Sequence, residues 1–343
     1  MLDSKTILIT GGAGSVGERL IPRFLESDLE SIRIFENNEP GLASIRRRLD
    51  DDRCRYLVGD VRDKNRLERA MQNVDIVVHT AAMKHVDISE YNPFEAVKTN
   101  VLGLQNIVDT AIDESVEKLV FTSSDKAVAP SNTMGTTKLL GERLVTAGNK
   151  YRGNREITLA SVRFGNVVNS SESVVQLFAE QIQNGGPVTL TDERMTRFFL
   201  TFEGIGDLVL GALEHMEGGE VFLRKMTAMR IEDLAQAMID VLAPQYGYDP
   251  EQVQVELIGR RIGETIHEHI MTEREAHRAV ENGELYAIPP EKTTENGYLT
   301  HKGLEGFSAP EVVERSSGEA DLLAPAEVRS FVEDEIVSEV KDE

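Results

Sequence analysis

Three glycines that follow a short apolar run constrain the fold of this chain more than any other feature. Thr6–Thr10 is rich in β-branched and apolar residues, which is typical of a buried strand, and a helical pattern follows the glycines. In such a unit Gly11 permits the tight turn, Gly14 lets the backbone approach a pyrophosphate, and Gly17 lets the helix pack on the strand. The alternative is a simple glycine-rich turn. The order of strand, glycines and helix favours a dinucleotide-binding loop.

Apolar runs alternate with helical patterns through the first half of the chain. Further strands are expected at Ser31–Glu36, Asp75–His79 and Lys118–Thr122, separated by helices near residues 39–50, 64–71 and 93–113. Strands that alternate with helices at this spacing predict an α/β fold with a doubly wound parallel sheet, the Rossmann arrangement.

The alternation loosens after about residue 165, so the chain is expected to have three parts. We expect a dinucleotide-binding domain at 1–168 and a smaller, mainly substrate-binding region at 169–295 that is interleaved with the first. Residues 296–343 form an acidic C-terminal extension. Its one amphipathic stretch, from Ala326 to Val340, predicts a terminal helix or a partly mobile tail.

The composition excludes several classes of protein. The formal net charge of −22 argues against a nucleic-acid binder, and it fits either a salt-adapted surface or a plain acidic one. We find no apolar run near the roughly 18 residues that span a bilayer, so we expect a cytoplasmic protein without membrane contact. The single cysteine, Cys54, excludes an intrachain disulfide. The spacing of His267, His269 and His277 predicts no metal site.

Two acidic residues at expected strand ends bear on the choice of cofactor. Glu36 closes the second strand, where a carboxylate binds the adenosine ribose hydroxyls and repels a 2′-phosphate, which favours NAD over NADP. The alternative is an exposed charge at a strand end. NADP stays possible if the loop that carries Arg46–Arg48 folds back. Asp60 is placed to meet the adenine amine, or is a turn residue.

Longer motifs carry a resemblance to a known family. They are Ala81-Ala-Met-Lys84-His-Val86, Asn92-Pro-Phe-Glu-Ala-Val-Lys-Thr-Asn100-Val-Leu-Gly103, Ser123-Ser-Asp-Lys-Ala-Val128, Met134-Gly-Thr-Thr-Lys138, Arg163-Phe-Gly-Asn-Val167 and Gly259-Arg-Arg-Ile-Gly-Glu264. Over about residues 5–290 the chain resembles the extended short-chain dehydrogenase/reductase family. Within that family it is most similar to the short, capsule-type UDP-N-acetylglucosamine 4,6-dehydratases, which have Asp-Lys where glucose-type dehydratases have Asp-Glu.

The resemblance implies a hydro-lyase that uses NAD or NADP. It would convert UDP-N-acetylglucosamine, a UDP-N-acetylhexosamine, into a UDP-4-keto-6-deoxy-N-acetylhexosamine for surface polysaccharide or glycan biosynthesis. The capsule-type resemblance favours inversion at carbon 5, and the sequence leaves this stereochemistry open. A homo-oligomer is expected by analogy. Two alternatives stay open: a nucleotide-sugar 4-epimerase or reductase on the same scaffold, and a non-catalytic protein that senses NAD.

The resemblance also assigns catalytic roles. It makes Lys126 the base at sugar carbon 5 and Asp125 the acid for the leaving 6-hydroxyl; the alternative is a surface ion pair. Both roles need a shifted pKa, lowered for the lysine and raised for the aspartate. Lys138 would bind the nicotinamide ribose. Met134 stands where the wider family has a proton-carrying tyrosine, so Ser124 with water, or Asp125 itself, would take the 4-hydroxyl proton.

Further residues are expected to contact the ligands. Besides the glycines and acids above, the cofactor contacts are Ser15, Val16, Val61, Thr80, Ala81, Ala82, Lys84, Asn100 and Lys138. The substrate contacts are Lys84, Asn166, Arg197, Arg261 and Glu264. The two arginines suit a pyrophosphate because of their fixed donor fork, and the alternative for each is a structural ion pair. The alternative for Lys84 is a solvated loop lysine.

Overall fold

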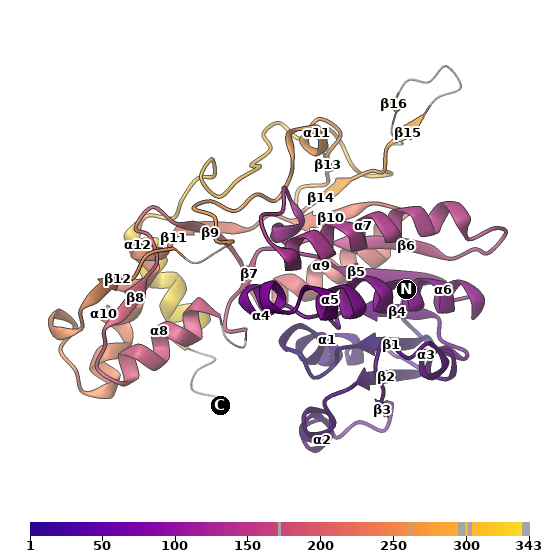
Figure 1. The fold of residues 1–343 in the computed structure, drawn as a ribbon, viewed down its shortest axis with the longest axis horizontal. Coiled ribbons are helices and arrows are strands. Elements are labelled where there is room, and N and C mark those ends of the chain that lie inside the picture. The colour runs from indigo at the N-terminus through magenta and orange to yellow at the C-terminus, as the bar shows by residue number, and fades with distance from the viewer. Residues whose placement is uncertain (171–172, 261–262, 294–298, 301–303, 338–343) are drawn as a thin grey trace.

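A nine-stranded sheet forms the centre of the protein. The computed structural model describes residues 1–343 apart from 171–172, 261–262, 294–298, 301–303 and 338–343. The strands of the large sheet are β1 (Thr6–Thr10), β2 (Ser31–Glu36), β3 (Cys54–Val58), β4 (Ile76–His79), β5 (Lys118–Thr122), β6 (Thr158–Val162), β10 (Val221–Arg224), β13 (Val280–Glu281) and β14 (Leu285–Ile288). Their order is β13-β14-β10-β6-β5-β4-β1-β2-β3 (Figure 1).

The pairing confirms the predicted α/β, doubly wound fold. All neighbours from β3 to β10 pair parallel, and β14 and β13 extend the sheet in antiparallel fashion. The chain reverses its direction of winding between β1 and β4, which are neighbours in the sheet. In such folds a ligand binds outside the carboxyl ends of the strands at this switch point. The strand order alone therefore predicts where a ligand-binding cavity should lie.

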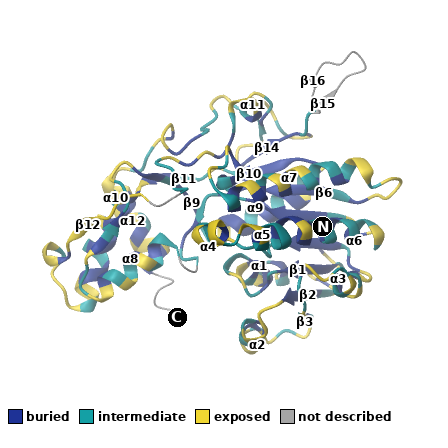
Figure 2. Cartoon of the chain, viewed as in Figure 1, coloured by how far each residue is buried: buried dark blue, intermediate teal, exposed yellow. Residues whose placement is uncertain are grey.

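Helices cover both faces of the sheet, because the strand residues alternate between two cores. Ile7 and Ile9 of β1 pack with helix α1 and helix α9, whereas Leu8 packs with helices α3, α6 and α7 on the other face. Figure 2 shows the central strands as the most buried part of the chain. These helices are α1 (Ser15–Leu25), α3 (Lys64–Met71), α6 (Gly103–Asp113), α7 (Thr133–Tyr151) and α9 (Phe202–His215), and α2 (Glu39–Arg48) covers the edge near β2 and β3.

The helix expected near residues 93–113 is interrupted. It consists of α5 (Pro93–Ala96), a π-helical turn over Val97–Leu102, and α6. Short helix α4 (Val86–Tyr91) precedes it and was not predicted, and neither was strand β3. A π-helical turn adds one residue to the helix and re-aims the side chains within it, and such turns are frequent at functional sites.

A second core lies at the left of Figure 1 and is built from later residues. Its strands are β7 (Asn166–Val167), β8 (Val188–Leu190), β9 (Thr196–Leu200), β11 (Thr227–Arg230) and β12 (Val255–Leu257), and its helices are α8 (Val174–Gln183), α10 (Ile231–Leu242) and α12 (Pro325–Phe331). The remaining elements are α11 (Glu273–Ala276), β15 (Lys292–Thr293), β16 (Leu299–Thr300) and 3₁₀ turns at Ala243–Tyr246 and Pro250–Gln252.

The C-terminal extension contributes to this second core. The predicted terminal helix is present as α12 and a π-helical turn over Val332–Ile336. Val328, Val332 and Ile336 are fully buried and pack in the same core as α8 and α10. The three-part division with boundaries at 168 and 295 stays a prediction, although β10 and β14 do return to the large sheet after the second core has begun.

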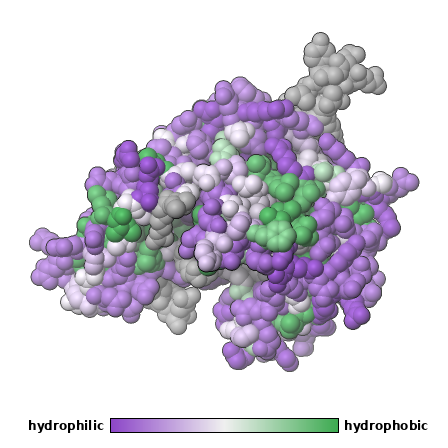
Figure 3. All heavy atoms as spheres, in the orientation of Figure 1, coloured by the Kyte–Doolittle hydropathy of each residue, from purple (hydrophilic) through white to green (hydrophobic). Residues whose placement is uncertain are grey.

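The surface on the face shown in Figure 3 is mainly hydrophilic, with an apolar patch in the region of α5 and α7. Phe94, Leu102 and Leu140 are exposed large apolar side chains on α5, the first π-helical turn and α7. Such patches are typical of contact surfaces. The expected homo-oligomer stays a prediction.

A buried arginine joins three parts of the chain. Arg163, directly after β6, is fully buried, and its Nη2 lies 2.6 Å from Glu142 Oε2 of α7 and 3.0 Å from Glu275 Oε1 of α11. Its Nη1 donates to the carbonyl oxygen of Ile270 at 2.7 Å. Burial raises the pKa of the Glu275 carboxyl, but Arg163 outweighs burial and lowers that pKa to about 2. Ser123 joins the network by donating to Glu142 Oε1 at 2.6 Å.

We expect Arg163→Met to lower the free energy of unfolding by about 3–5 kcal/mol, because it leaves two buried carboxylates without their partner. Chemical denaturation at pH 7 measures the loss. The matched control is Arg194→Met, which removes an ion pair to Asp192 from an arginine that is 67% exposed, and should leave the transition unchanged. Equal stability of the two variants would contradict the role given to Arg163.

Candidate active site

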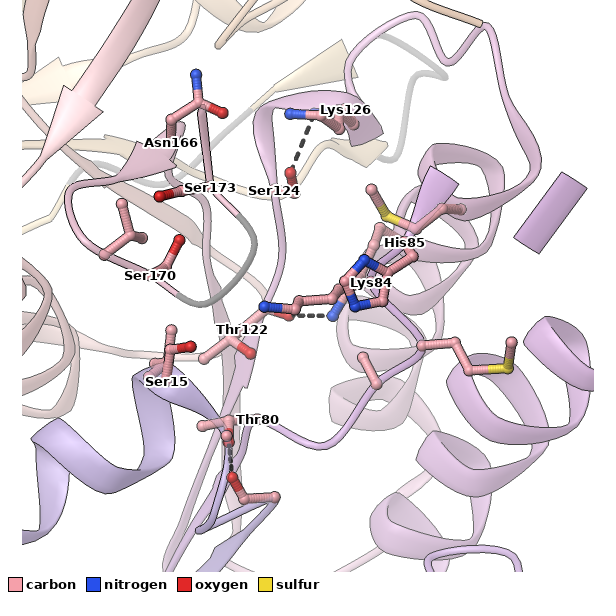
Figure 4. A pocket seen from close by; sticks show the side chains of 18 of the residues that line it. Ser15, Thr80, Lys84, His85, Thr122, Ser124, Lys126, Asn166, Ser170 and Ser173 are labelled. Atoms are coloured by element: carbon pink, nitrogen blue, oxygen red, sulfur yellow. Dashed lines mark hydrogen bonds between the residues drawn. The ribbon is translucent and has the colours of Figure 1, made fainter. Parts of the chain in front are cut away.

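A cavity of 1010 Å³ opens at the carboxyl ends of the central strands. The loops after β1, β2, β4 and β5 line one side of it, and residues of β7, α8 and β9 line the other. Figure 4 shows Ser15 and Thr80 towards one end of the cavity, and Lys126 and Asn166 towards the other. The cavity thus lies at the switch point and also reaches the second core.

The glycine loop has the geometry that the sequence predicts. Gly11 has φ of +70°, and a Cβ atom there would lie 2.6 Å from the backbone nitrogen of Ala81. A Cβ on Gly17 would lie 2.3 Å from the carbonyl oxygen of Gly11, so this glycine serves helix packing and does not itself line the cavity. Gly14 precedes α1, and the first helical residues, Ser15 and Val16, line the cavity. The positive end of α1 therefore points at this space.

Acidic side chains line the part of the cavity beyond β2 and β3. Glu36 accepts hydrogen bonds from the backbone amides of Ala13, Asn37 and Asn38, so it also fixes the glycine loop. Asp60 binds Arg62, which lowers the pKa of the Asp60 carboxyl. Arg62 was not predicted and lines the cavity, as does Val61.

The arginines of α2 are placed differently. Among the described residues, Arg46, Arg47 and Arg48 do not line the cavity, and Arg48 forms an ion pair with Glu18.

One amide side chain, that of Asn100, holds the loop after β4 by hydrogen bonds to its backbone. Asn100 lies in the first π-helical turn, accepts a hydrogen bond from the Met83 amide at 2.8 Å and donates to the Met83 carbonyl oxygen at 3.0 Å. Asn100 also donates to Thr137 of α7 at 2.9 Å. It is buried and does not line the cavity, so it positions the loop instead of contacting a ligand directly. The predicted contacts that do line the cavity here are Thr80, Ala81, Ala82 and Lys84.

Lys138 lies on α7, one turn after Met134, and both residues line the cavity. The Lys138 amine donates to the Thr122 carbonyl oxygen at 2.8 Å and lies 4.8 Å from the centre of the Phe121 ring. Burial lowers the pKa of Lys138 to about 8. Burial, with the nearby Lys138 charge, also lowers the pKa of His79 to about 3, so His79 stays neutral near pH 7.

The Asp125–Lys126 pair forms a 3₁₀ turn just after β5. Asp125 Oδ1 accepts hydrogen bonds from the Ser124 hydroxyl at 2.7 Å and the Lys126 amine at 3.1 Å, whereas its buried Oδ2 has no hydrogen-bond partner among the residues that the structure describes. Ser124 and Lys126 line the cavity, but Asp125 lies behind them, which corrects the expectation that both charged residues face it. Asp125 therefore reaches the cavity through the Ser124 hydroxyl.

The pKa of Lys126 is shifted in the direction opposite to the one its expected role requires. Burial lowers this pKa, but the charges of Asp125 and Glu268 outweigh burial and the net effect raises it. Near neutral pH the Lys126 amine therefore stays protonated, and it pairs with the buried Asp125 side chain. Lys126 must lose the influence of one carboxylate before it acts as a base.

The substrate-side residues are only partly as expected. Asn166, Arg197 and Glu264 line the cavity, whereas Arg261 lies outside the described residues. Arg197 donates to the carbonyl oxygens of Thr265 and Ile266, and its Nε lies 3.5 Å from Glu268 Oε1. These contacts of Arg197 fit the structural ion pair, which the sequence analysis gave as the alternative to a pyrophosphate contact. Within the described residues no group of three potential ligands is placed to hold a metal ion.

Residues 7–290 match a family described as polysaccharide biosynthesis protein. The chain belongs to this family. Its relatives include an uncharacterized membrane protein of Methanocaldococcus jannaschii, 47% identical over 286 residues, which are 83% of this chain and 86% of that protein. Among the described residues, no helix of this chain is both long enough and apolar enough to cross a membrane.

Two further groups of relatives carry enzyme names. A UDP-N-acetylglucosamine 4,6-dehydratase (inverting) of Campylobacter jejuni is 41% identical over 292 residues, 84% of each chain. A UDP-glucose 4-epimerase of Rickettsia conorii is 39% identical over 293 residues, again 84% of each chain. These similarities support a nucleotide-sugar dehydratase or epimerase of the short-chain dehydrogenase/reductase type.

Solved structures agree on the fold. Pen from Bacillus thuringiensis superposes with a TM-score of 0.86 at 36% identity, covering 96% of this chain and 98% of that one. A dTDP-glucose 4,6-dehydratase of Streptomyces venezuelae, solved with NAD and TYD bound, gives a TM-score of 0.67 at 23% identity, covering 76% and 86%. At that identity the second likeness bears on the fold alone.

The lowered pKa of Lys138 leads to a test of stability against pH. The folded state holds this proton less tightly than the unfolded state, so the buried charge destabilises the fold below pH 8, and the penalty fades as pH rises towards 10.5. The wild type should therefore gain about 2 kcal/mol of unfolding free energy relative to Lys138→Met between pH 7 and pH 10. Denaturation of both proteins at the two pH values measures it. Lys150→Met, on the exposed end of the same helix, is the control, and an identical pH response in both variants would contradict the assignment.

Proposed function

We propose that this protein is an NAD-dependent UDP-N-acetylglucosamine 4,6-dehydratase that makes a UDP-4-keto-6-deoxy-N-acetylhexosamine. The observation that carries the proposal is the Asp125–Lys126 ion pair after β5, in which Asp125 is buried and Lys126 lines a large cavity. Elimination of water needs an acid and a base at adjacent sugar carbons, whereas a plain hydride transfer does not. The 41% identity to a protein of this name supports the same reaction.

The residues around the cavity fit a bound dinucleotide. Gly11 and Gly14 line the cavity without side chains, α1 begins at the cavity, and the Glu36 carboxylate favours NAD by repelling a 2′-phosphate. Lys138 would hold the nicotinamide ribose, and Met134 would pack beside it. When bound, the nicotinamide supplies a hydride acceptor for sugar carbon 4 and a hydride donor for carbon 6.

Ser124 and Asp125 together replace the proton carrier that is missing at Met134. Ser124 lines the cavity and already donates its hydroxyl hydrogen to Asp125. In the proposal the sugar 4-hydroxyl gives its proton to the Ser124 oxygen while Ser124 gives its own proton to Asp125. Asp125 is then a neutral acid, and the same path returns the proton to the 6-hydroxyl, which leaves as water.

The same proton transfer lowers the pKa of the Lys126 amine and so prepares it to act as a base. Once Asp125 is neutral, one of the two carboxylates that raise the pKa of Lys126 no longer does so. The Lys126 amine first gives one proton to solvent water and then takes the proton of carbon 5, which restores its own proton count. A solvent proton later adds to carbon 5 of the product, so the proton given to solvent is balanced. The sugar then has lost one water, and each side chain regains its starting proton.

A nucleotide-sugar 4-epimerase is the second candidate, and the relatives with that name at 39% identity favour it. An epimerase needs no acid for a leaving 6-hydroxyl and releases no ketone. A reductase would consume reduced cofactor, and a non-catalytic NAD sensor would turn over no sugar nucleotide. The acid–base pair favours the dehydratase over all three.

We also propose a cytoplasmic homo-oligomer that serves surface polysaccharide or glycan biosynthesis.

Incubation with UDP-N-acetylglucosamine and NAD⁺ in heavy water tests the reaction. We expect NMR to show a 4-keto-6-deoxy product with deuterium at carbon 5, because the proton that adds to carbon 5 comes from solvent. Lys126→Met should lower turnover at least about 10³-fold while NAD still binds. Lys150→Met is the control and should keep full turnover. A 4-epimer without ketone would refute the dehydratase, and normal turnover of Lys126→Met would refute the base.

Cofactor preference gives a separate test. Glu36→Ala should weaken binding of NAD by about tenfold or more and weaken NADP less, because the variant loses both the ribose contact and the repulsion of a 2′-phosphate. Titration calorimetry with each cofactor measures the ratio of dissociation constants. Glu39→Ala, on the exposed start of α2, is the control. An unchanged ratio would remove Glu36 as the selector.

A further inference from the structure

A buried carboxylate outside the predicted site contacts Lys126. Glu268 lies in the segment between β12 and α11 and is nearly buried. Its Oε1 is 3.8 Å from the Lys126 amine and 3.5 Å from Arg197 Nε. Glu268 does not line the cavity, whereas Lys126 and Arg197 do, so it contacts both residues without being part of the ligand space itself.

The C-terminal extension holds Glu268 in place. Ser317 is fully buried, and its hydroxyl accepts a hydrogen bond from the Glu268 amide at 3.0 Å. The Ser317 amide donates to the Glu268 carbonyl oxygen at 2.9 Å, and the Ser317 hydroxyl also donates to the Thr196 carbonyl oxygen at 3.0 Å. Residue 317 lies beyond the family match, which ends at residue 290. This serine therefore ties the late chain to both Glu268 and β9.

We propose that Glu268 is a positioning residue that holds the Lys126 amine while Asp125 is neutral, and that Ser317 fixes Glu268 for this purpose. The inference rests on the proposed function. Asp125 is the nearer partner of Lys126, at 3.1 Å, but it gives up its charge when it becomes the acid. A lysine held by Asp125 alone would lose its anchor at the step in which it acts. Glu268, which lies beside Arg197, takes no part in that proton transfer and can hold the Lys126 amine throughout the step.

The charges around the Lys126 amine determine the sign of the pH effect. Asp125 on the same turn and Glu268 on the later segment raise the pKa of Lys126, and Arg197 on β9 lowers it. Glu268→Gln keeps the shape and removes one of the two carboxylates. The amine should then lose its proton at a lower pH, while its position becomes less defined.

We expect Glu268→Gln to lower kcat about 10- to 100-fold with KM changed less than about twofold, because the lost contact is to the base and not to the ligand. The midpoint of the acid limb of the kcat–pH profile should move to lower pH by about half to one unit. Ser317→Ala should shift the limb in the same direction by less. Glu273→Gln and Ser330→Ala, both exposed, are the matched controls and should resemble the wild type.

Direct titration of the Lys126 amine separates this proposal from the proposed function. In protein labelled with ¹⁵N-lysine, the signal that disappears in Lys126→Met identifies the amine, and its titration needs no turnover. A lower midpoint in Glu268→Gln supports the proposal even if no ketone forms, in which case only the dehydratase assignment fails. Unchanged kcat in an active enzyme, or an unchanged midpoint of the amine, would overturn the role of Glu268.

Discussion

The buried Arg163 guanidinium is the interaction on which the site depends most. It binds Glu142 of α7 and Glu275 of α11, while Ser123 binds the same Glu142 carboxylate two residues before the 3₁₀ turn that begins at Asp125. A full charge in a dry interior is tolerated only when its partners are held firmly. The network therefore fixes the end of β5, the helix that carries Lys138, and the segment that leads from Glu268 as one unit.

The site also reconciles an acidic protein with an anionic substrate. The formal net charge is −22, yet Lys84, Lys126 and Lys138 line the cavity. Two arginines and four carboxylates of the described residues also line it, so the lining is far less acidic than the whole protein, and α1 points its positive end into it. At physiological ionic strength exposed charges are screened beyond about 8 Å, whereas buried ones are screened much less. The local field of the cavity therefore decides binding, and the distant acidic surface has little effect on it.

The sequence predicts those features that depend on local spacing. Glycines at 11, 14 and 17 and the alternation of strands and helices determined the sheet and its switch point. What it does not predict depends on long-range packing. Glu268 stands in an ordinary polar segment and becomes part of the site only because the chain returns to β9. Asp125 is buried behind the cavity wall because extended Ser124 and the 3₁₀ turn after it send successive side chains in different directions, which residue type alone does not reveal.

The pairing of Ser317 with Thr196 and Glu268 has a consequence for biosynthesis. These contacts join residues separated by 121 and 49 positions, and such non-local contacts form late in folding because a long loop must close first. The large sheet needs only the chain up to residue 288, so it can assemble while the extension is still being made. The surroundings of Lys126 are completed only when the last segment arrives. A nascent chain would thus fold its scaffold before it becomes a catalyst.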